Sequence, residues 1–396
     1  MHPDPQYIYT RNIRVFYITE FFRSLSFFIP IWVAYELQYI TISQLALLEA
    51  IIMGFQLVSE LPTGAFADLF GKRVSVIIGN ILVMISLAIY ACSRSFDMFL
   101  VYALISGIGG SFISGAQEAL LYDTCKEAGK EDQFSKINAK MGVIFQVGLA
   151  FAIVVGGLLG SLSFAYPLWM TTGAVFLCCI VCFFFIEPFI DTEKFTVKRY
   201  IAQTKEGVKE LLKTPYIKKI SLFYILIGTI TWTCVMIFSM ALLTELKFSV
   251  MELGIEVALI RVINSFIVFR VLHIDKLLTK KRTFLFFPIL MMIALLPGIF
   301  FTKYMALVAV AFITLASTSR WIILGKYTNE EFDSKNRATA ISTLSMAIGI
   351  LYVIIVYFSG PVMEHFGGTR TIFTCLGVLT ALFILPLGIH LAKHHS

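Results

Sequence analysis

The chain has 396 residues, of which 58% are hydrophobic and 14% are charged, and its formal net charge is +7. A soluble domain carries about 25% charged and about 45–50% apolar residues, so this composition excludes a soluble enzyme or a soluble nucleic-acid-binding protein. A membrane span needs about 20 apolar residues, so the length suits a bundle of many spans with short loops.

Twelve apolar segments, bounded by glycine, proline or charged residues, follow one another along the chain. Each predicts a membrane-spanning helix, so we expect an all-α membrane protein with two sets of six helices. The first set is predicted at 13–36, 44–66, 74–93, 97–121, 138–161 and 165–186. The second set is predicted at 219–243, 250–272, 283–301, 303–325, 338–362 and 369–391.

The polar stretch 187–218 is the longest connection between predicted helices. It divides the chain into an N-terminal bundle, 1–186, and a C-terminal bundle, 219–396. Apolar residues alternate with lysines in this stretch, at Tyr200, Ile201, Val208, Leu211 and Leu212. The alternation predicts an amphipathic helix on the anionic surface of the membrane, with a solvated linker as the alternative.

Positive charge is unequally distributed between the two predicted sides of the membrane. Of the 32 Lys and Arg residues, 24 fall in the termini and the loops of one side, and four fall in the loops of the other. The positive-inside rule therefore places both termini in the cytoplasm of a multi-pass plasma-membrane protein. The residues before the first span lack the features of a signal peptide. Topology thus explains the basic excess, and no nucleic-acid partner is expected.

The seven cysteines predict neither a disulfide nor a metal site. Five lie within apolar runs, and none is spaced with histidine as zinc ligands are. Cys178, Cys179 and Cys182 cluster in one predicted helix, where small soft residues suit packing. We expect no metal and no cofactor.

The connection between the second and third predicted helices reads GAFADLFGKRVSV and contains Gly64, Asp68, Gly71, Lys72 and Arg73. Its tight turn needs glycine, and an acid beside two bases can bridge the ends of helices. A degenerate copy, DKLLTKKR at 275–282, follows the eighth predicted helix, as two repeats of six helices would require.

This G-x-x-x-D-x-x-G-R/K-R/K loop resembles the signature of the major facilitator superfamily, and the resemblance covers the whole chain. It implies two six-helix bundles around a central cavity that opens to each side of the membrane in turn, without chemistry on the solute. It also implies that Asp68 latches the cytoplasmic side closed, supported by Lys72 and Arg73. A turn that only sets topology would explain the two bases but not the glycine and aspartate spacing.

Two patterns of the drug:proton antiporters of this family are only partly met. Their fourth helix carries an arginine four residues before a glycine, whereas Ala103 precedes Gly107 here. The fifth-helix pattern is kept at Gly148, Gly156 and Gly157 and lost at Ala152 and Ile153. These departures weaken efflux by proton exchange, although small residues still allow close packing of the fifth helix.

Glu118 and Arg320 lie at comparable depths in the fourth and tenth predicted helices. The family resemblance brings these helices together on the cytoplasmic side when the cavity opens outward. We therefore predict an ion pair between Glu118 and Arg320 that forms in one state only and acts as a gate. Local contacts of each residue near the headgroups are the alternative.

Arginines within predicted spans point to the solute cavity. A charge at the bilayer centre costs at least about 2.5–3.5 kcal/mol, so it should face a cavity or a partner. Arg23 and Arg261 are the first candidates for solute contact, with Asn264 and Trp232 on helices that line the cavity in the family. Glu20, three residues from Arg23 on the same helical face, could instead neutralise it locally.

A coupling proton needs one titratable group in the cavity, and the candidates are Glu118, Glu20 and Glu256. We expect a monomeric secondary transporter of a small organic solute in contact with membrane lipids, with proton-coupled efflux favoured. Uptake or exchange of an anionic or zwitterionic metabolite is one alternative. A sensor or lipid-handling protein of the same fold is another, against which the intact loop and the intramembrane charges argue. A membrane-embedded enzyme would need a catalytic set that the chain lacks.

Overall fold

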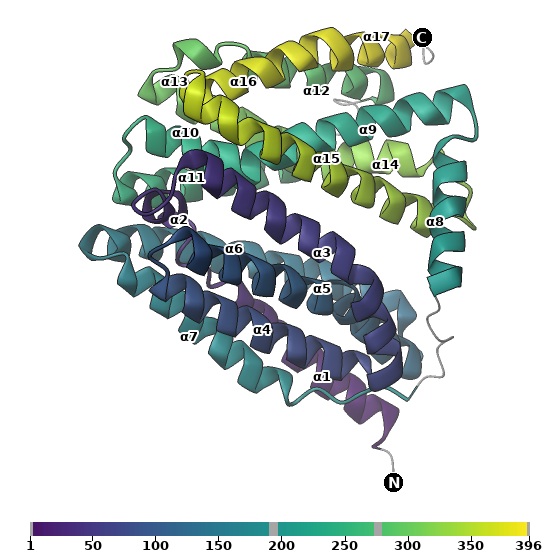
Figure 1. Cartoon of the computed structure of the whole chain (residues 1–396). Helices are drawn as coiled ribbons and strands as arrows, with labels where there is room; N and C mark the ends of the chain where they lie inside the picture. Colours follow the sequence, from purple (N-terminus) through teal and green to yellow (C-terminus); the bar gives the residue numbers. More distant parts are fainter. Residues whose placement is uncertain (1–2, 190–196, 273–278, 394–396) are drawn as a thin grey trace. The chain divides into compact units, whose positions relative to one another are not determined.

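The computed structural model describes residues 3–189, 197–272 and 279–393, and all regular elements in these ranges are helical (Figure 1). The predicted all-α fold class is confirmed. The chain divides into two compact units, the first comprising Met1–Tyr39 with Ile51–Tyr200 and the second Ile40–Ala50 with Ile201–Ser396. One long helix, α3, therefore contributes its first turns to the second unit and the rest to the first.

The helices of the first unit are long, apart from the five-residue α2 and the 3-10 turn η1. They are α1 (Pro5–Ser24), α2 (Trp32–Glu36), α3 (Ile42–Phe70), α4 (Lys72–Cys92), α5 (Phe96–Glu127), the 3-10 turn η1 (Glu131–Gln133), α6 (Phe134–Leu162) and α7 (Ala165–Cys182).

Three π-helical turns, η2, η4 and η5, interrupt the helices that follow. The elements are α8 (Val197–Leu211), α9 (Pro215–Thr233), η2 (Cys234–Phe238), α10 (Ser239–Glu245), α11 (Val250–Leu272), α12 (Lys280–Leu295), the 3-10 turn η3 (Gly298–Phe300), α13 (Lys303–Ser319), η4 (Arg320–Leu324), α14 (Gly325–Asn329), α15 (Arg337–His365), α16 (Gly368–Leu379), η5 (Thr380–Ile384) and α17 (Leu385–Lys393).

Ten helical segments in the described ranges are long and apolar enough to cross a membrane. The predicted spans 13–36 and 250–272 are not among the ten, because α1 and α11 carry several charged residues in or beside their apolar stretches. The continuous helix predicted over 13–36 is wrong. Helix α1 ends at Ser24, and α2 begins only at Trp32.

The break between α1 and α2 has two causes. Pro30 supplies no backbone N–H and disfavours helical geometry in the residue before it. The second cause is tertiary packing. The Phe27 carbonyl group lies directly against Gly156 of α6, where a Cβ would lie only 1.9 Å from the carbonyl oxygen. A segment that satisfies a hydropathy count can therefore still be non-helical in its middle.

Helices α4 and α5 pack backbone to backbone. A Cβ on Gly79 would lie 2.9 Å from the Gly109 carbonyl oxygen, and a Cβ on Gly109 would lie 3.1 Å from that of Gly79. Facing glycines of this kind allow close helix approach in a membrane, where lipid supplies no hydrophobic driving force. The close packing fixes α5, which carries most of the site described below.

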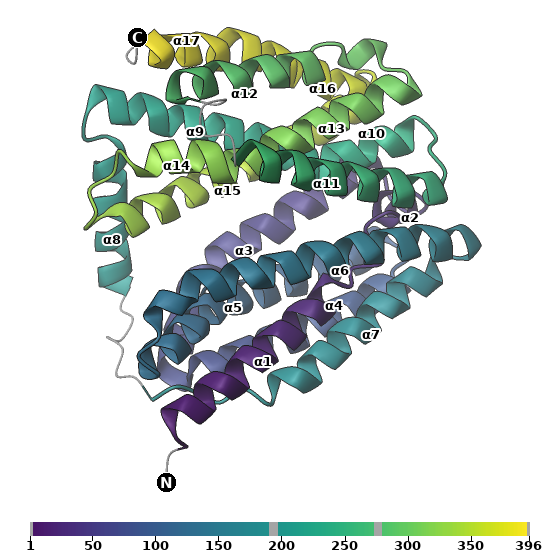
Figure 2. The same cartoon turned by 180° about the vertical axis from the view of Figure 1, so that it is seen from behind.

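Helix α8 lies beside the ends of α14 and α15, as both views show (Figures 1 and 2). The buried Glu210 carboxylate accepts hydrogen bonds from the Asp333 backbone N–H at 3.1 Å and from Asn336 Nδ2 at 3.2 Å. Ile201 and Val208 are exposed, which is compatible with the predicted membrane-surface contact. That contact stays a prediction.

Candidate functional site

The turn after α3 is built around Gly71. Its φ is +101°, a left-handed value that favours glycine, and a Cβ there would also lie 3.1 Å from the Glu187 carboxylate. Glu187 Oε1 accepts from the Lys72 backbone N–H at 2.8 Å, and Oε2 accepts from the Arg73 N–H at 2.6 Å. The carboxylate thereby satisfies two free N–H groups at the start of α4 and complements the helix dipole.

The two bases of this loop have different partners within the first unit. The Lys72 ammonium forms an ion pair with Asp123 of α5, and both side chains are largely buried. Arg73 Nη2 donates to the Phe183 carbonyl oxygen at 3.0 Å. These contacts tie α4 to α5 and to the end of α7, so the loop joins three helices of one unit.

Asp68 is half-buried in the last turn of α3, and Gly64 lies one turn earlier. The latch role of Asp68 stays a prediction. Residues 275–278 of the degenerate copy lie outside the described residues.

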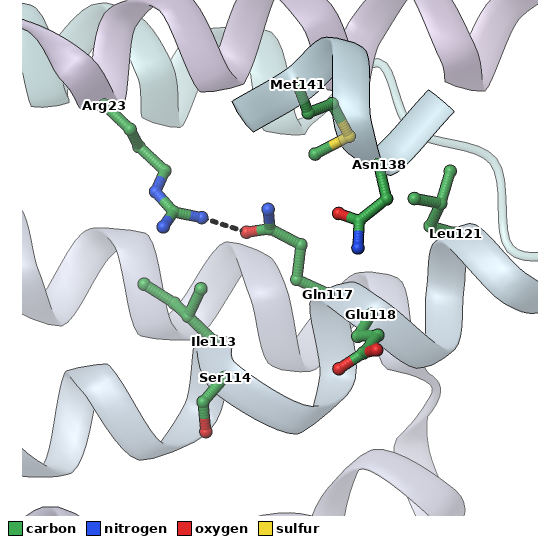
Figure 3. Close-up of a pocket in the computed structure, with 8 residues that line it drawn as sticks. All are labelled: Arg23, Ile113, Ser114, Gln117, Glu118, Leu121, Asn138 and Met141. Carbon is green, nitrogen blue, oxygen red and sulfur yellow. Dashed lines mark hydrogen bonds between the residues drawn. The ribbon is translucent and has the colours of Figure 1, made fainter. Parts of the chain in front are cut away.

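Two charged residues that the sequence marks in the first unit, Arg23 and Glu118, line one pocket of about 190 Å³ (Figure 3). Helix α1 contributes one side chain, and α5 and α6 contribute the others. The lining residues are Arg23, Ile113, Ser114, Gln117, Glu118, Leu121, Asn138 and Met141.

Arg23 is the cationic centre of the pocket. Figure 3 shows its guanidinium reaching from α1 toward α5, where Nη1 donates a hydrogen bond to Gln117 Oε1. The same nitrogen lies 3.7 Å from Glu20 Oε2, which also accepts from Gln117 Nε2 at 3.4 Å. The Glu20 side chain is only 11% exposed, whereas the Arg23 side chain is 31% exposed. Arg23 is therefore partly neutralised by Glu20 and is also exposed to the pocket.

Glu118 supplies the opposite charge in the pocket wall. It is exposed, as is Asn138 of α6, and no side chain within the described ranges pairs with it. The pocket thus offers donors at Arg23 and Asn138 and a free carboxylate at Glu118. Such a set can bind a small molecule that carries both a negative and a positive group.

Arg320 is the corresponding cation of the second unit. It begins the π-helical turn η4 and is 1% exposed, and its guanidinium lies 4.9 Å from the Tyr224 ring centroid and 4.4 Å from that of Trp321. A Cβ on Gly228 would lie 3.1 Å from Arg320 Nη1, so this glycine leaves room for the guanidinium. Nε and Nη1 have no hydrogen-bond partner among the described residues.

Glu118 and Arg320 belong to different units, and their pairing as a gate stays a prediction. Each does have unused hydrogen-bonding capacity in its own unit. Because π-helical turns are frequently found at functional sites, the position of Arg320 in η4 supports a functional role for this residue.

The other predicted cavity residues of the second unit have separate environments. Asn264 of α11 is 3% exposed, and its Nδ2 donates to the Ala311 carbonyl oxygen of α13 at 2.9 Å, so its amide holds two helices together. Trp232 packs on Tyr352, with ring centroids 5.2 Å apart. Arg261 and Glu256 are half-buried in α11 and have no side-chain partner among the described residues.

Four residues that line the pocket or contact the loop 64–73 are not among the site residues predicted from the sequence: Gln117, Asn138, Asp123 and Glu187. Amides carry no charge, so Gln117 and Asn138 do not stand out in a search for charged residues within spans. Glu187 directly follows the sixth apolar run, on the side of the membrane where the loops are basic. An acid at that position could have indicated an ionic contact with the loop 64–73. In the described ranges, no group of three or more His, Cys, Asp and Glu residues could hold a metal ion.

Comparison with known proteins places this architecture among transporters. Residues 15–317 match the family described as Major Facilitator Superfamily. A relative from Bacillus subtilis (strain 168), named "Uncharacterized MFS-type transporter YxaM", is 26% identical over 255 residues, which are 62% of this chain. The match spans 62% of the length of that relative.

Solved structures share the fold at low sequence identity. The nucleoside transporter NupG is 12% identical with a TM-score of 0.75, covering 98% of this chain and 99% of its own. The D-xylose-proton symporter is 16% identical with a TM-score of 0.70, covering 95% and 96%. A POT family transporter in complex with 5-aminolevulinic acid is 12% identical with a TM-score of 0.72, covering 98% and 97%.

Proposed function

The chain belongs to the Major Facilitator Superfamily, and from this premise we propose that it transports a small zwitterionic organic solute by alternating access, coupled to protons. The family resemblance carried by the loop 64–73 is confirmed. The protein is a multi-pass membrane transporter of the secondary type, and it is not an enzyme. Solute class, coupling and direction are the proposed parts.

The pocket of the first unit is the observation that supports the solute class. Arg23 offers a guanidinium suited to a carboxylate, and Glu118 offers an unpaired carboxylate suited to an ammonium group. Its volume of about 190 Å³ is below the about 300–1,000 Å³ typical of ligand pockets, which favours a solute of metabolite size. Because Glu20 neutralises part of the Arg23 charge, a zwitterion suits the pocket better than a dianion.

Export is the direction that we propose. Part of the glycine pattern of antiporters is retained in α6. One of these glycines, Gly148, packs closely on α1, where a Cβ would lie 1.9 Å from Ser24 Oγ. Ala152 and Ile153, which depart from that pattern, are fully buried. Uptake or exchange of the same solute is the alternative, because the Arg23 pocket would bind a zwitterion in either direction.

Flux measurements in proteoliposomes test the proposal. We expect flux of amino acids and their derivatives but not of neutral sugars, and acceleration when an imposed pH gradient favours export. Arg23→Gln should lower this flux because the carboxylate loses its cationic partner. Arg14→Gln, which removes an exposed arginine of the same helix, is the matched control.

Three results would count against the proposal in different ways. Equal flux of sugars and amino acids would contradict the solute class. Indifference to the pH gradient would contradict proton coupling. A folded protein without flux of any solute would favour the sensor or lipid-handling alternative.

A further inference from the structure

The first turns of α3 pack closely on α15 within the second unit. A Cβ on Gly360 would lie 3.0 Å from Ser43 Cα, so the two backbones are nearly in contact. Glu364 Oε2 accepts from Thr41 Oγ1 at 2.9 Å and from the Ser43 N–H at 3.3 Å. We call this contact, between residues 41–50 and 352–364, the α3–α15 seam.

A second carboxylate, Glu49, lies at the end of the seam opposite Glu364. It is half-buried, and its side chain is hydrogen-bonded to the hydroxyl of Tyr352 on α15. Tyr352 is 2% exposed and packs on Trp232 of α9. Glu49 is therefore held by a neutral phenol in a largely apolar contact.

Among the described residues, Glu49 differs from Glu20 in having no cationic partner. It differs from Glu118 and Glu256 in being hydrogen-bonded to a buried phenol. Glu20 is paired with Arg23. In the described part of the chain no cation pairs with Glu49, and Tyr352 is the titratable group against it. Glu364 is engaged at the other end of the seam, and Glu60, three turns further along α3, belongs to the first unit.

An unpaired carboxylate within a membrane span is energetically costly, because the hydrocarbon core does not solvate the charge. A neutral carboxylic acid avoids this cost and can both donate to and accept from a phenol. The closed seam therefore favours the protonated form of Glu49. Opening of the seam admits water, which stabilises the carboxylate and removes that preference.

We propose that Glu49 is the group that takes up and releases the coupling proton, with the Tyr352 hydroxyl holding the protonated carboxyl in the closed seam. When α3 and α15 part, the carboxyl O–H bond breaks and the proton passes to water on the side to which the seam opens. Binding of a proton from that side restores the neutral acid and allows closure. This inference rests on the proposed proton-coupled function.

Infrared spectroscopy of the membrane-reconstituted full chain tests the assignment without a known solute. At neutral pH we expect a carbonyl-stretch band of a protonated carboxyl that disappears in Glu49→Gln. Glu60→Gln, in the same helix, and Glu364→Gln, in the same seam, should keep the band. Tyr352→Phe should shift it to higher frequency, because a hydrogen bond to the carboxyl is lost. A band that survives Glu49→Gln, or that is absent from the wild type, overturns the inference.

Proteoliposome flux separates this inference from the proposed function. Glu49→Gln should lose the component driven by the pH gradient and keep solute exchange without a gradient. Full gradient-driven flux in Glu49→Gln would overturn the role of Glu49 and leave proton-coupled transport intact. A wild-type protein that shows the Glu49 band but no response to the gradient would instead refute proton coupling, and the coupling role of Glu49 with it.

Discussion

A single carboxylate, Glu187, connects the end of the first unit's last helix to the start of α4. Burial raises the pKa of this carboxyl above its usual value of 4.5, although the N–H groups of Lys72 and Arg73 oppose the shift. The folded protein therefore holds the Glu187 proton more tightly than the unfolded chain does. The resulting stabilisation is complete below pH 4.5 and is lost as pH rises through the raised pKa.

We therefore expect a pH-dependent difference in stability between the wild type and Glu187→Gln, whose side chain stays neutral. The unfolding temperature of the wild type should fall relative to that of the variant as the pH rises above 4.5. Glu187→Ala, which removes the cap of α4, should lose about 0.5–2 kcal/mol at every pH. Thermal unfolding in detergent between acidic and neutral pH measures both effects.

Glu131→Gln, at an exposed carboxylate between α5 and α6, is the control for general charge effects. Parallel melting curves for wild type and Glu187→Gln across the pH range would contradict the assigned cause. The Glu187 carboxylate would then contribute only geometry to the turn.

At the level of helices, the facing glycines of α4 and α5 set a packing distance that a methyl group should disturb. Gly79→Ala places a Cβ 2.6 Å from Ile113 Cγ1 and 2.9 Å from the Gly109 oxygen. We expect a loss of about 1–3 kcal/mol from overpacking. The measurement is thermal unfolding of purified protein, with size-exclusion chromatography as a check on folding.

Gly115, also in α5, provides the matched comparison because nothing lies within 4 Å of a Cβ placed there. Gly115→Ala should stabilise the helix by about 0.5–1 kcal/mol, since alanine restricts the unfolded chain. Equal effects of the two substitutions would show that helix propensity, and not contact between the two backbones, decides the outcome.

The sequence predicted most helices because hydropathy and flanking charges depend on local composition. It missed the break after Ser24, where the local effect of Pro30 acts together with packing of Phe27 against Gly156 of a distant helix, and the π-helical turn at Arg320, which leaves no mark in an apolar run. Charges within spans were visible, so Arg23 and Glu20 could be named. Their link through Gln117 could not, because pairing across 94 residues depends on how α1 and α5 pack.

At the scale of the whole molecule, the two units each present an unpaired charge of opposite sign. Glu118 has no partner in its described surroundings, and Nε and Nη1 of Arg320 have no hydrogen-bond partner among the described residues. If the two residues pair in one state, we expect Glu118→Gln to impair transport because the buried Arg320 guanidinium loses its partner, at a cost of about 3–5 kcal/mol. Arg320→Gln should impair transport because it removes the cation of the pair. Solute flux of the two variants in proteoliposomes measures the loss.

The charge-swapped pair, Glu118→Arg with Arg320→Glu, distinguishes a gate from two separate roles. If the residues meet in one state, the double variant should exceed either swapped single variant in activity. Additive damage would show that the sites are uncoupled, with Glu118 acting in the solute pocket and Arg320 acting elsewhere.

The sharing of α3 between the two units has a consequence for biosynthesis. Residues 41–50 leave the ribosome early, but Tyr352, Gly360 and Glu364 follow about 300 residues later, which at about 5–20 residues per second is a delay of about 15–60 s. During that interval Glu49 and the close-packing surface beside it have no α15 to cover them. A chain that terminates before α15 therefore keeps this stretch uncovered by the segment it packs against in the complete protein.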